Sequence, residues 1–202
     1  MKAMIVFLVV GILASISPHA MAAESGDGRF AFGPQGGAVW PNFSFKNSSV
    51  NKDNVNGYLA GAFVELGIWA ITLRPEVNYV EKGYRLNGVA EVKHHYLEIP
   101  VLLKFNPFND AVVSPFIVVG PSWSKHLDSK VTLLGATTTY NDTADRWDVA
   151  GVGGAGIEFN LSEHVGINLQ ARYNFGFRDL DSSATEIRSR GLYGMGGLAF
   201  TL

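Results

Sequence analysis

The sequence predicts an all-β protein, an eight-stranded antiparallel transmembrane β-barrel whose strands follow one another in an up-and-down meander. Three observations predict it. Apolar and polar residues alternate with period two along eight segments, long polar connections alternate with short turns, and aromatic residues gather where the segments end. A strand with one apolar and one polar face produces this alternation. Closure into a barrel leaves no unpaired backbone edge in hydrocarbon.

The N-terminal residues are typical of a signal for export through the Sec pathway. Lys2 supplies a positive charge, Ala3–Ile16 is an apolar run, and Ala20-Met21-Ala22 offers small residues for cleavage. As a helix the run would span only about 21 Å, short of the ~30 Å hydrocarbon core. We therefore expect a signal peptide over residues 1–22 and a single barrel domain over residues 23–202.

The composition limits the possible functions. The chain has 202 residues, of which 16 are basic and 18 acidic, so its charge gives no reason to expect nucleic acid as a partner. Hydrophobic residues make up 47% and exclude a disordered chain, and the absence of cysteine excludes disulfides and thiolate metal sites. We expect no cofactor, no metal ion and no enzymatic activity.

The strands differ in how clearly the pattern marks them. The clearest runs from Val165 to Arg178, where every second residue is apolar and the intervening ones are polar or glycine. In the three weakest, Arg29–Trp40, Gly57–Gly67 and Ser114–Ser124, glycine and proline make it hard to tell the apolar face from the polar one. In chain order the expected strands are Arg29–Trp40, Gly57–Gly67, Ile71–Tyr79, Tyr96–Phe105, Ser114–Ser124, Trp147–Asn160, Val165–Arg178 and a last one ending at Leu202.

The connections predict the topology. Short turns are expected at Gly67–Ile68, Asn106–Val113 and Leu161–His164. The long polar connections are Pro41–Asn56, Glu81–His94, Lys125–Asp145 and Asp179–Ile187. Membrane barrels place short turns in the periplasm and long loops outside. Because an even number of strands returns both termini to one side, we expect periplasmic termini.

The direction of the apolar face separates a membrane barrel from a soluble, lipocalin-like one, which would fill its interior with the apolar rows. Here the apolar rows carry large side chains from end to end, and the polar rows are rich in Gly, Asn and Gln. We therefore expect lipid outside and ion pairs in the lumen, with Arg74 and Arg172 each meeting a carboxylate from a neighbouring strand. The lumen candidates are Glu65, Arg74, Glu76, Glu98, Lys104, Asp148, Glu158 and Arg172.

Aromatic residues near the strand ends predict two interfacial belts. Those next to the long connections are Trp40, Tyr79, Trp123, Trp147, Tyr173 and Phe175. Those next to the short turns are Trp69, Phe105, Phe116, Phe159 and Phe200.

Two groups could carry other chemistry. Ser124, His126 and Asp128 are the residue types of a nucleophilic triad, but their spacing within a predicted loop fixes no geometry. The pair His94-His95 lacks a third metal ligand. The asparagine-rich connection Pro41–Asn56 could contact an external ligand, although asparagine also suits turns.

Three segments carry a family resemblance: Leu73–Tyr79 (LRPEVNY), Lys82-Gly83-Tyr84 and Tyr96–Lys104 (YLEIPVLLK). They resemble the porin-family outer-membrane β-barrel domain, and Tyr96–Lys104 is the most specific of them. Phe116–Pro121 and Ala171-Arg172-Tyr173 with Gly176 are also similar to its later strands. The resemblance covers essentially the whole mature chain. It departs at Leu202, where an aromatic residue is usual.

The resemblance implies a bacterial outer-membrane location, with membrane lipid and the barrel-assembly machinery as partners. It does not imply an open pore. We expect a monomer with a structural or surface-interaction role through its long outer connections and a side-chain-filled lumen. The alternatives are a narrow conduit for small solutes and a barrel enzyme that acts on lipid or peptide.

Overall fold

The computed structural model describes residues 28–45, 52–86, 90–109, 111–133, 136–141, 147–176 and 187–202. The expected signal peptide lies outside these ranges, as do Phe177 and Arg178 of the clearest predicted strand. Within the described ranges no helix is long and apolar enough to cross a membrane.

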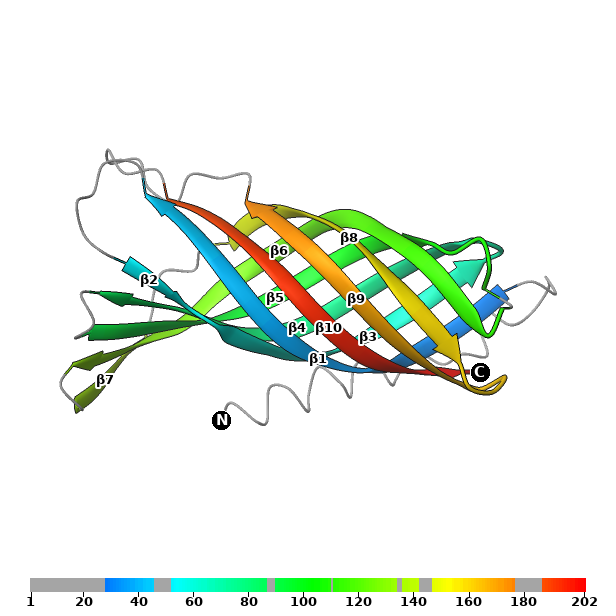
Figure 1. The fold of residues 1–202 in the computed structure, drawn as a ribbon, viewed down its shortest axis with the longest axis horizontal. Helices are drawn as coiled ribbons and strands as arrows, with labels where there is room; N and C mark the ends of the chain where they lie inside the picture. Colours follow the sequence, from blue (N-terminus) through cyan, green and yellow to red (C-terminus); the bar gives the residue numbers. More distant parts are fainter. Residues whose placement is uncertain are drawn as a thin grey trace.

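The described elements are all β-strands. They are β1 (Gly28–Phe45), β2 (Lys52–Val55), β3 (Gly57–Ile68), β4 (Ile71–Leu86), β5 (Ala90–Phe105), β6 (Val113–Leu133), β7 (Ala136–Asn141), β8 (Trp147–Asn160), β9 (Val165–Gly176) and β10 (Ile187–Thr201). Eight of them form a closed antiparallel ring in the order β1-β3-β4-β5-β6-β8-β9-β10, and β10 pairs with β1 (Figure 1). The predicted eight-stranded meander is confirmed.

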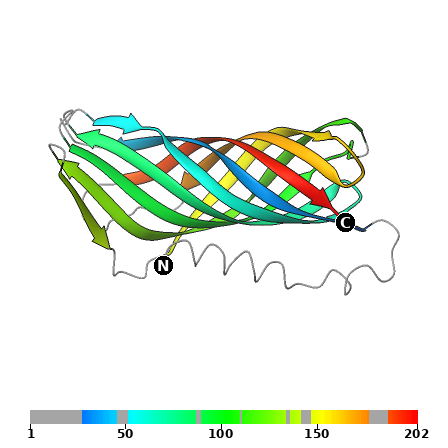
Figure 2. The same ribbon diagram turned by 90° about the horizontal axis from the view of Figure 1, so that it is seen from below.

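The strands run much further toward one end than the sequence predicts. β4 continues to Leu86 and β5 begins at Ala90, so most of the expected Glu81–His94 loop is paired hairpin. β6 likewise continues to Leu133 and pairs with β7, while β1 reaches Phe45 and β2 pairs with β4. The prediction of long loops at these connections was wrong. A strand that extends beyond the membrane keeps its backbone hydrogen bonds but no longer needs a full row of apolar residues on its outer face, so the alternating pattern fades before the strand ends. Figure 2 shows these extensions at the end opposite Leu202.

Short connections close the other end. The turn between β3 and β4 is Trp69-Ala70, two residues later than predicted. Trp69 has a φ of 55°, the left-handed region that costs a non-glycine residue roughly 1–2 kcal/mol. Asn109, in the turn between β5 and β6, donates a hydrogen bond of 3.0 Å to the Trp69 carbonyl oxygen. This bond ties two neighbouring turns together.

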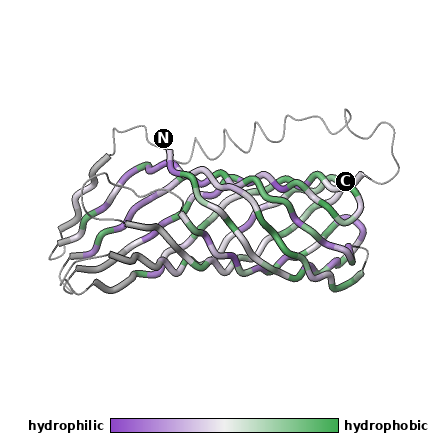
Figure 3. Tube along the Cα trace, turned by 90° about the horizontal axis from the view of Figure 1, so that it is seen from above, coloured by the Kyte–Doolittle hydropathy of each residue, from purple (hydrophilic) through white to green (hydrophobic). Residues whose placement is uncertain are grey.

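The two faces of each strand differ in accessibility as expected for a membrane barrel. On β9, Leu169 is 52% exposed whereas the adjacent Asn168 is fully buried. The apolar residues of β4 and β10 follow the same rule, with Ile71 54% and Leu198 42% exposed. Figure 3 shows hydrophobic and hydrophilic positions alternating along the strands. The apolar rows therefore form the outer surface of the barrel.

Part of the lumen is apolar. Leu102, Phe116, Val118 and Val152 form one buried cluster. Val39, Leu59, Val80, Tyr193 and Met195 form another. The assignment of Phe116 to the interfacial belt was wrong, because its side chain points inward and is 3% exposed. A Cβ atom on Gly156 would lie only 2.5 Å from Cζ of the Phe116 ring, so glycine at position 156 leaves room for that ring.

Candidate functional site

A chain of ion pairs begins at the short-turn end of the lumen. Arg29 on β1 reaches Glu158 on β8 at 2.7 Å, and Glu158 is fully buried. Lys104 on β5 binds the other oxygen of Glu158 and also lies 2.9 Å from Glu65 on β3. The Lys104 ammonium also lies 4.8 Å from the centre of the Phe116 ring. The ion pairs link β1, β8, β5 and β3 across the lumen.

The middle of the lumen is organised around Glu76 on β4. Its carboxylate accepts hydrogen bonds of 2.7 Å from both terminal nitrogens of Arg172 and one of 2.7 Å from Nε of Arg74. Arg74 also lies 2.7 Å from Glu65, and Glu65 connects this group to the chain of ion pairs that begins at Arg29. Gln35 on β1 donates to Glu76 at 2.9 Å and accepts from Arg74 at 2.9 Å. All five residues are at most 6% exposed.

The ion-pair partners of Arg74 and Arg172 differ from the prediction in one respect. Arg74 meets Glu65 on β3, which is the neighbouring strand. Arg172 on β9 meets Glu76 on β4, although these two strands are not paired through their backbones. The sequence could not reveal this pair, since alternation says which residues face inward but not which of them meet.

A further ion pair lies nearer the projecting end. Lys82 on β4 is 2.8 Å from Glu98 on β5, and the Tyr193 hydroxyl donates to Glu98 at 3.2 Å. Asp148, the remaining predicted lumen residue, is half-buried and lies opposite Ser124 of β6. Sequence reasoning missed Arg29 and Lys82. Arg29 lies at the start of a weakly patterned strand, and Lys82 lies where a loop was expected.

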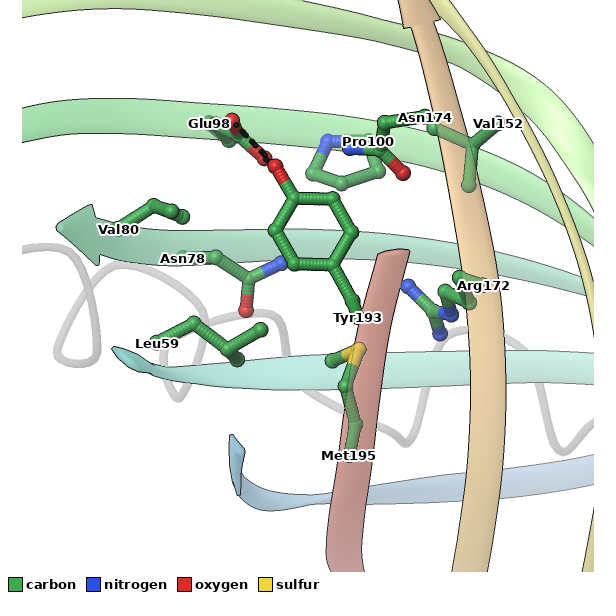
Figure 4. Close-up of a pocket in the computed structure, with 10 residues that line it drawn as sticks. All are labelled: Leu59, Asn78, Val80, Glu98, Pro100, Val152, Arg172, Asn174, Tyr193 and Met195. Carbon is green, nitrogen blue, oxygen red and sulfur yellow. Dashed lines mark hydrogen bonds between the residues drawn. The ribbon is translucent and has the colours of Figure 1, made fainter. Parts of the chain in front are cut away.

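A small gap lies between some of these groups (Figure 4). The gap that Asn78, Glu98, Arg172, Asn174 and Tyr193 line together with apolar side chains leaves about 10 Å³ for the centre of a water molecule. This volume suits about one water. Asn174 Oδ1, which has no hydrogen-bond partner within the described protein, is available to that water.

Three polar side chains meet inside the barrel at its projecting mouth. Ser129 Oγ lies 2.8 Å from His94 Nδ1 and 3.1 Å from His126 Nε2. The Tyr96 ring packs beside them, with its centroid 5.1 Å from that of His126. His94 lies on the projecting part of β5, beyond the outer belt of aromatic side chains. Burial lowers its pKa to about 4, with a contribution from neighbouring His126 and His95.

His95 points to the opposite, outer face of the same extension. Its Nδ1 lies 2.5 Å from Asp128 on β6, and its Nε2 lies 3.1 Å from Glu81 on β4. The Tyr79 ring stacks on it at 5.5 Å. His94 and His95 therefore cannot bind one ion together. Asp128 faces away from His126, so the structure does not assemble the triad that Ser124, His126 and Asp128 would form.

Apart from Phe116, which points inward, the aromatic candidates lie on the outer face or, for Trp69, in a turn. Trp40, Trp123, Trp147, Tyr173 and Phe175 are each 37–43% exposed toward the projecting end, where Tyr79 is half-buried. At the other end Phe105 is 44% and Phe200 39% exposed, Phe159 is half-buried, and Trp69 is 70% exposed. Phe200 packs on Phe32 with ring centroids 6.0 Å apart.

Within the described ranges, no group of three or more His, Cys, Asp or Glu residues could hold a metal ion. A search among curated proteins finds no match to this sequence.

Many solved structures match this fold, and two of them illustrate the likeness. Neisserial surface protein A is 16% identical with a TM-score of 0.53, over 84% of this chain and 97% of that one. The outer membrane protein OprG from Pseudomonas aeruginosa is 13% identical with a TM-score of 0.55, over 87% of this chain and 96% of that one. The family described as "Outer membrane protein beta-barrel domain" matches residues 18–182. The resemblance found in the sequence is thus confirmed, and the chain belongs to this family of bacterial outer-membrane β-barrel proteins.

Proposed function

We propose that this protein is a monomeric outer-membrane barrel with a sealed lumen, whose role is structural or lies in surface interaction through the strands that project from one end. One observation carries the proposal: Glu76 is held between Arg74 and Arg172 in the middle of the lumen, with every partner buried. A solute could pass only by displacing these side chains.

The energetics favour a sealed barrel over a conduit. Separating one member of a buried, hydrogen-bonded ion pair costs about 3–5 kcal/mol. Passage would require the Glu76 pairs to open together with the packed Leu102 and Phe116 side chains. The gap beside Arg172 and Tyr193 has room for about one water. An eight-stranded barrel has an interior narrow enough for side chains to fill, which supports a sealed lumen.

The shape supports an orientation with the short turns and both ends of the barrel domain in the periplasm. Leu202 N donates to the Phe30 carbonyl at 3.0 Å, and Thr201 N donates to the His164 carbonyl at 2.9 Å, so these ends lie beside a short turn. The extensions of β4, β5 and β6 then project outside the cell, where β2 and β7 widen them. We propose this sheet as the surface that meets an external partner.

The proposal assigns no reaction to the protein. The side chains that could have formed a nucleophilic triad point to different faces, and Asp128 is engaged by His95. The aspartate that would orient the histidine of such a triad therefore faces away from it.

Planar-bilayer recording tests the sealed lumen. Insertion is verified by the gel-mobility shift that folded barrels show on boiling, and the wild type is then expected to give no channel steps. A variant in which Arg74, Glu76 and Arg172 are all replaced by alanine, provided it keeps the gel shift, is expected to conduct and serves as the control. Steady single-channel steps from the wild type would support the conduit instead.

Proteolysis of intact cells tests the orientation. Trypsin is expected to cut the projecting hairpins near Lys93 or Lys130 without permeabilisation. Cleavage at these lysines only after the outer membrane is opened would reverse the proposed orientation.

A further inference from the structure

Two histidines that are far apart in sequence converge on one hydroxyl at the projecting mouth of the lumen. His94 lies on β5 and His126 on β6, and both point into the barrel. His94 is directly opposite Ser129, and His126 is opposite Tyr96, so the imidazoles are diagonal neighbours on two paired strands. Their ring centroids are 5.4 Å apart.

The atoms that meet are of the kinds that coordinate metal ions. His94 presents Nδ1 and His126 presents Nε2 to the same Ser129 oxygen, at 2.8 Å and 3.1 Å. Two imidazole nitrogens directed at one point from a rigid pair of strands form a bidentate donor set. All three side chains are only partly buried, so an ion and its waters can enter from outside.

We propose that His94 and His126, with the Ser129 hydroxyl as a weaker third donor, form a binding site for a divalent first-row transition-metal ion, with Cu²⁺ bound most tightly. Imidazole suits this class of ion, and affinities for a given nitrogen site rise from Mn²⁺ to Cu²⁺. Mg²⁺ and Ca²⁺ prefer oxygen ligands and do not fit this donor set.

The geometry requires only a small adjustment. Metal–imidazole bonds are about 2.0–2.1 Å long. An ion placed where Ser129 Oγ now lies would be 2.8 Å and 3.1 Å from the two nitrogens, so each imidazole must close by about 1 Å or less. Rotation of Ser129 about its χ1 bond makes the room. The strands themselves need not move.

The positive charge opposite His94 is compensated. Lys82 is directly opposite His94 on β4, but its ammonium is bound to Glu98 at 2.8 Å. The Tyr96 ring packs against both imidazoles, with centroids 6.3 Å from His94 and 5.1 Å from His126, and it limits their rotation. A preorganised pair of ligands loses less side-chain entropy when the ion binds.

Titration of the refolded, tag-free barrel with CuCl₂ tests the site, by calorimetry and by electron paramagnetic resonance. The wild type is expected to bind one Cu²⁺ with two nitrogen ligands. His94→Gln, which keeps a side chain able to bond to Ser129, and His126→Ala are each expected to weaken binding by roughly tenfold or more. His164→Ala, at an exposed turn on the opposite end, is the matched control and should bind like the wild type.

Each variant is checked for folding by the gel-mobility shift, so that a loss of binding reports on the ligands. Unchanged Cu²⁺ affinity in folded His94→Gln and His126→Ala would overturn the proposal. Loss of binding in His164→Ala, or displacement of Cu²⁺ by excess Mg²⁺, would overturn it as well.

Discussion

Arg172 and Glu76 form a doubly hydrogen-bonded ion pair, with both bonds 2.7 Å long, between strands β9 and β4. In the closed ring the path from β4 to β9 passes β5, β6 and β8, so the two strands are diametrically opposed. The pair therefore spans the full width of the lumen. It joins opposite walls of the barrel directly.

Removing Arg172 is expected to destabilise the barrel strongly. Arg172→Ala leaves the buried Glu76 with one cationic partner fewer, which costs about 3–5 kcal/mol of unfolding free energy. Lys93→Ala, which removes a partly exposed ion pair with Glu81, should cost less than about 1 kcal/mol. Urea titrations of the two variants in lipid vesicles measure the difference. Equal stability of both variants would show that the lumen network contributes little.

The inward ring of Phe116 should matter more than the outward ring of Phe105. Phe116→Ala opens a cavity beside Leu102 and is expected to cost about 3–5 kcal/mol. Phe105 is 44% exposed on the lipid face, where lipid replaces the lost contacts of an alanine variant, so the effect should be clearly smaller. The same unfolding titration compares the two, and a larger effect at Phe105 would place Phe116 outside the packed lumen.

Gly33 should not tolerate a side chain. A Cβ there would clash with the Leu198 carbonyl oxygen, so Gly33→Ala forces β1 and β10 apart and should cost at least about 2 kcal/mol. Gly153 has no atom within 4 Å of the same position, and Gly153→Ala is its matched control. Thermal loss of the gel-mobility shift ranks the two variants. Similar melting of both would contradict the close approach of β1 to β10.

His95 is expected to hold the projecting strands together. It bridges Glu81 and Asp128, so His95→Ala should speed amide hydrogen exchange in the extensions of β4, β5 and β6. Exchange in the membrane strands near Leu169 should not change. Mass spectrometry of peptides from both regions measures this, and equally faster exchange throughout the barrel would mean that His95 supports the whole fold.

The sequence predicts the barrel well, because lipid contact imposes a strict rule. Each outer residue must be apolar, and the row from Val165 to Phe175 displays this without interruption. The rule ends where the membrane ends. Within Glu81–His94 the apolar row is short, with Tyr84, Leu86 and Val92, but Asn87-Gly88 between them is a hairpin-turn signal that the reading by apolar rows missed.

The interior was harder to predict. Inside the barrel, size and partner matter more than polarity, so apolar residues such as Val39 and Leu59 occur among polar ones. Arg29 and Lys82 were missed for the related reason that their strands have weak or no alternation at those positions. The pairing of Arg172 with Glu76 depends on barrel diameter and strand stagger, which no local pattern encodes.

The most direct test of the account is the accessibility of single cysteines along β9 in lipid. The natural chain has no cysteine, so each introduced one carries a unique nitroxide label. Labels at Val165, Ile167, Leu169, Ala171 and Tyr173 are expected to collide with oxygen dissolved in the bilayer, and labels at Gly166, Asn168 and Gln170 are expected to be shielded. The reverse pattern would place the polar row of β9 against lipid and contradict the account.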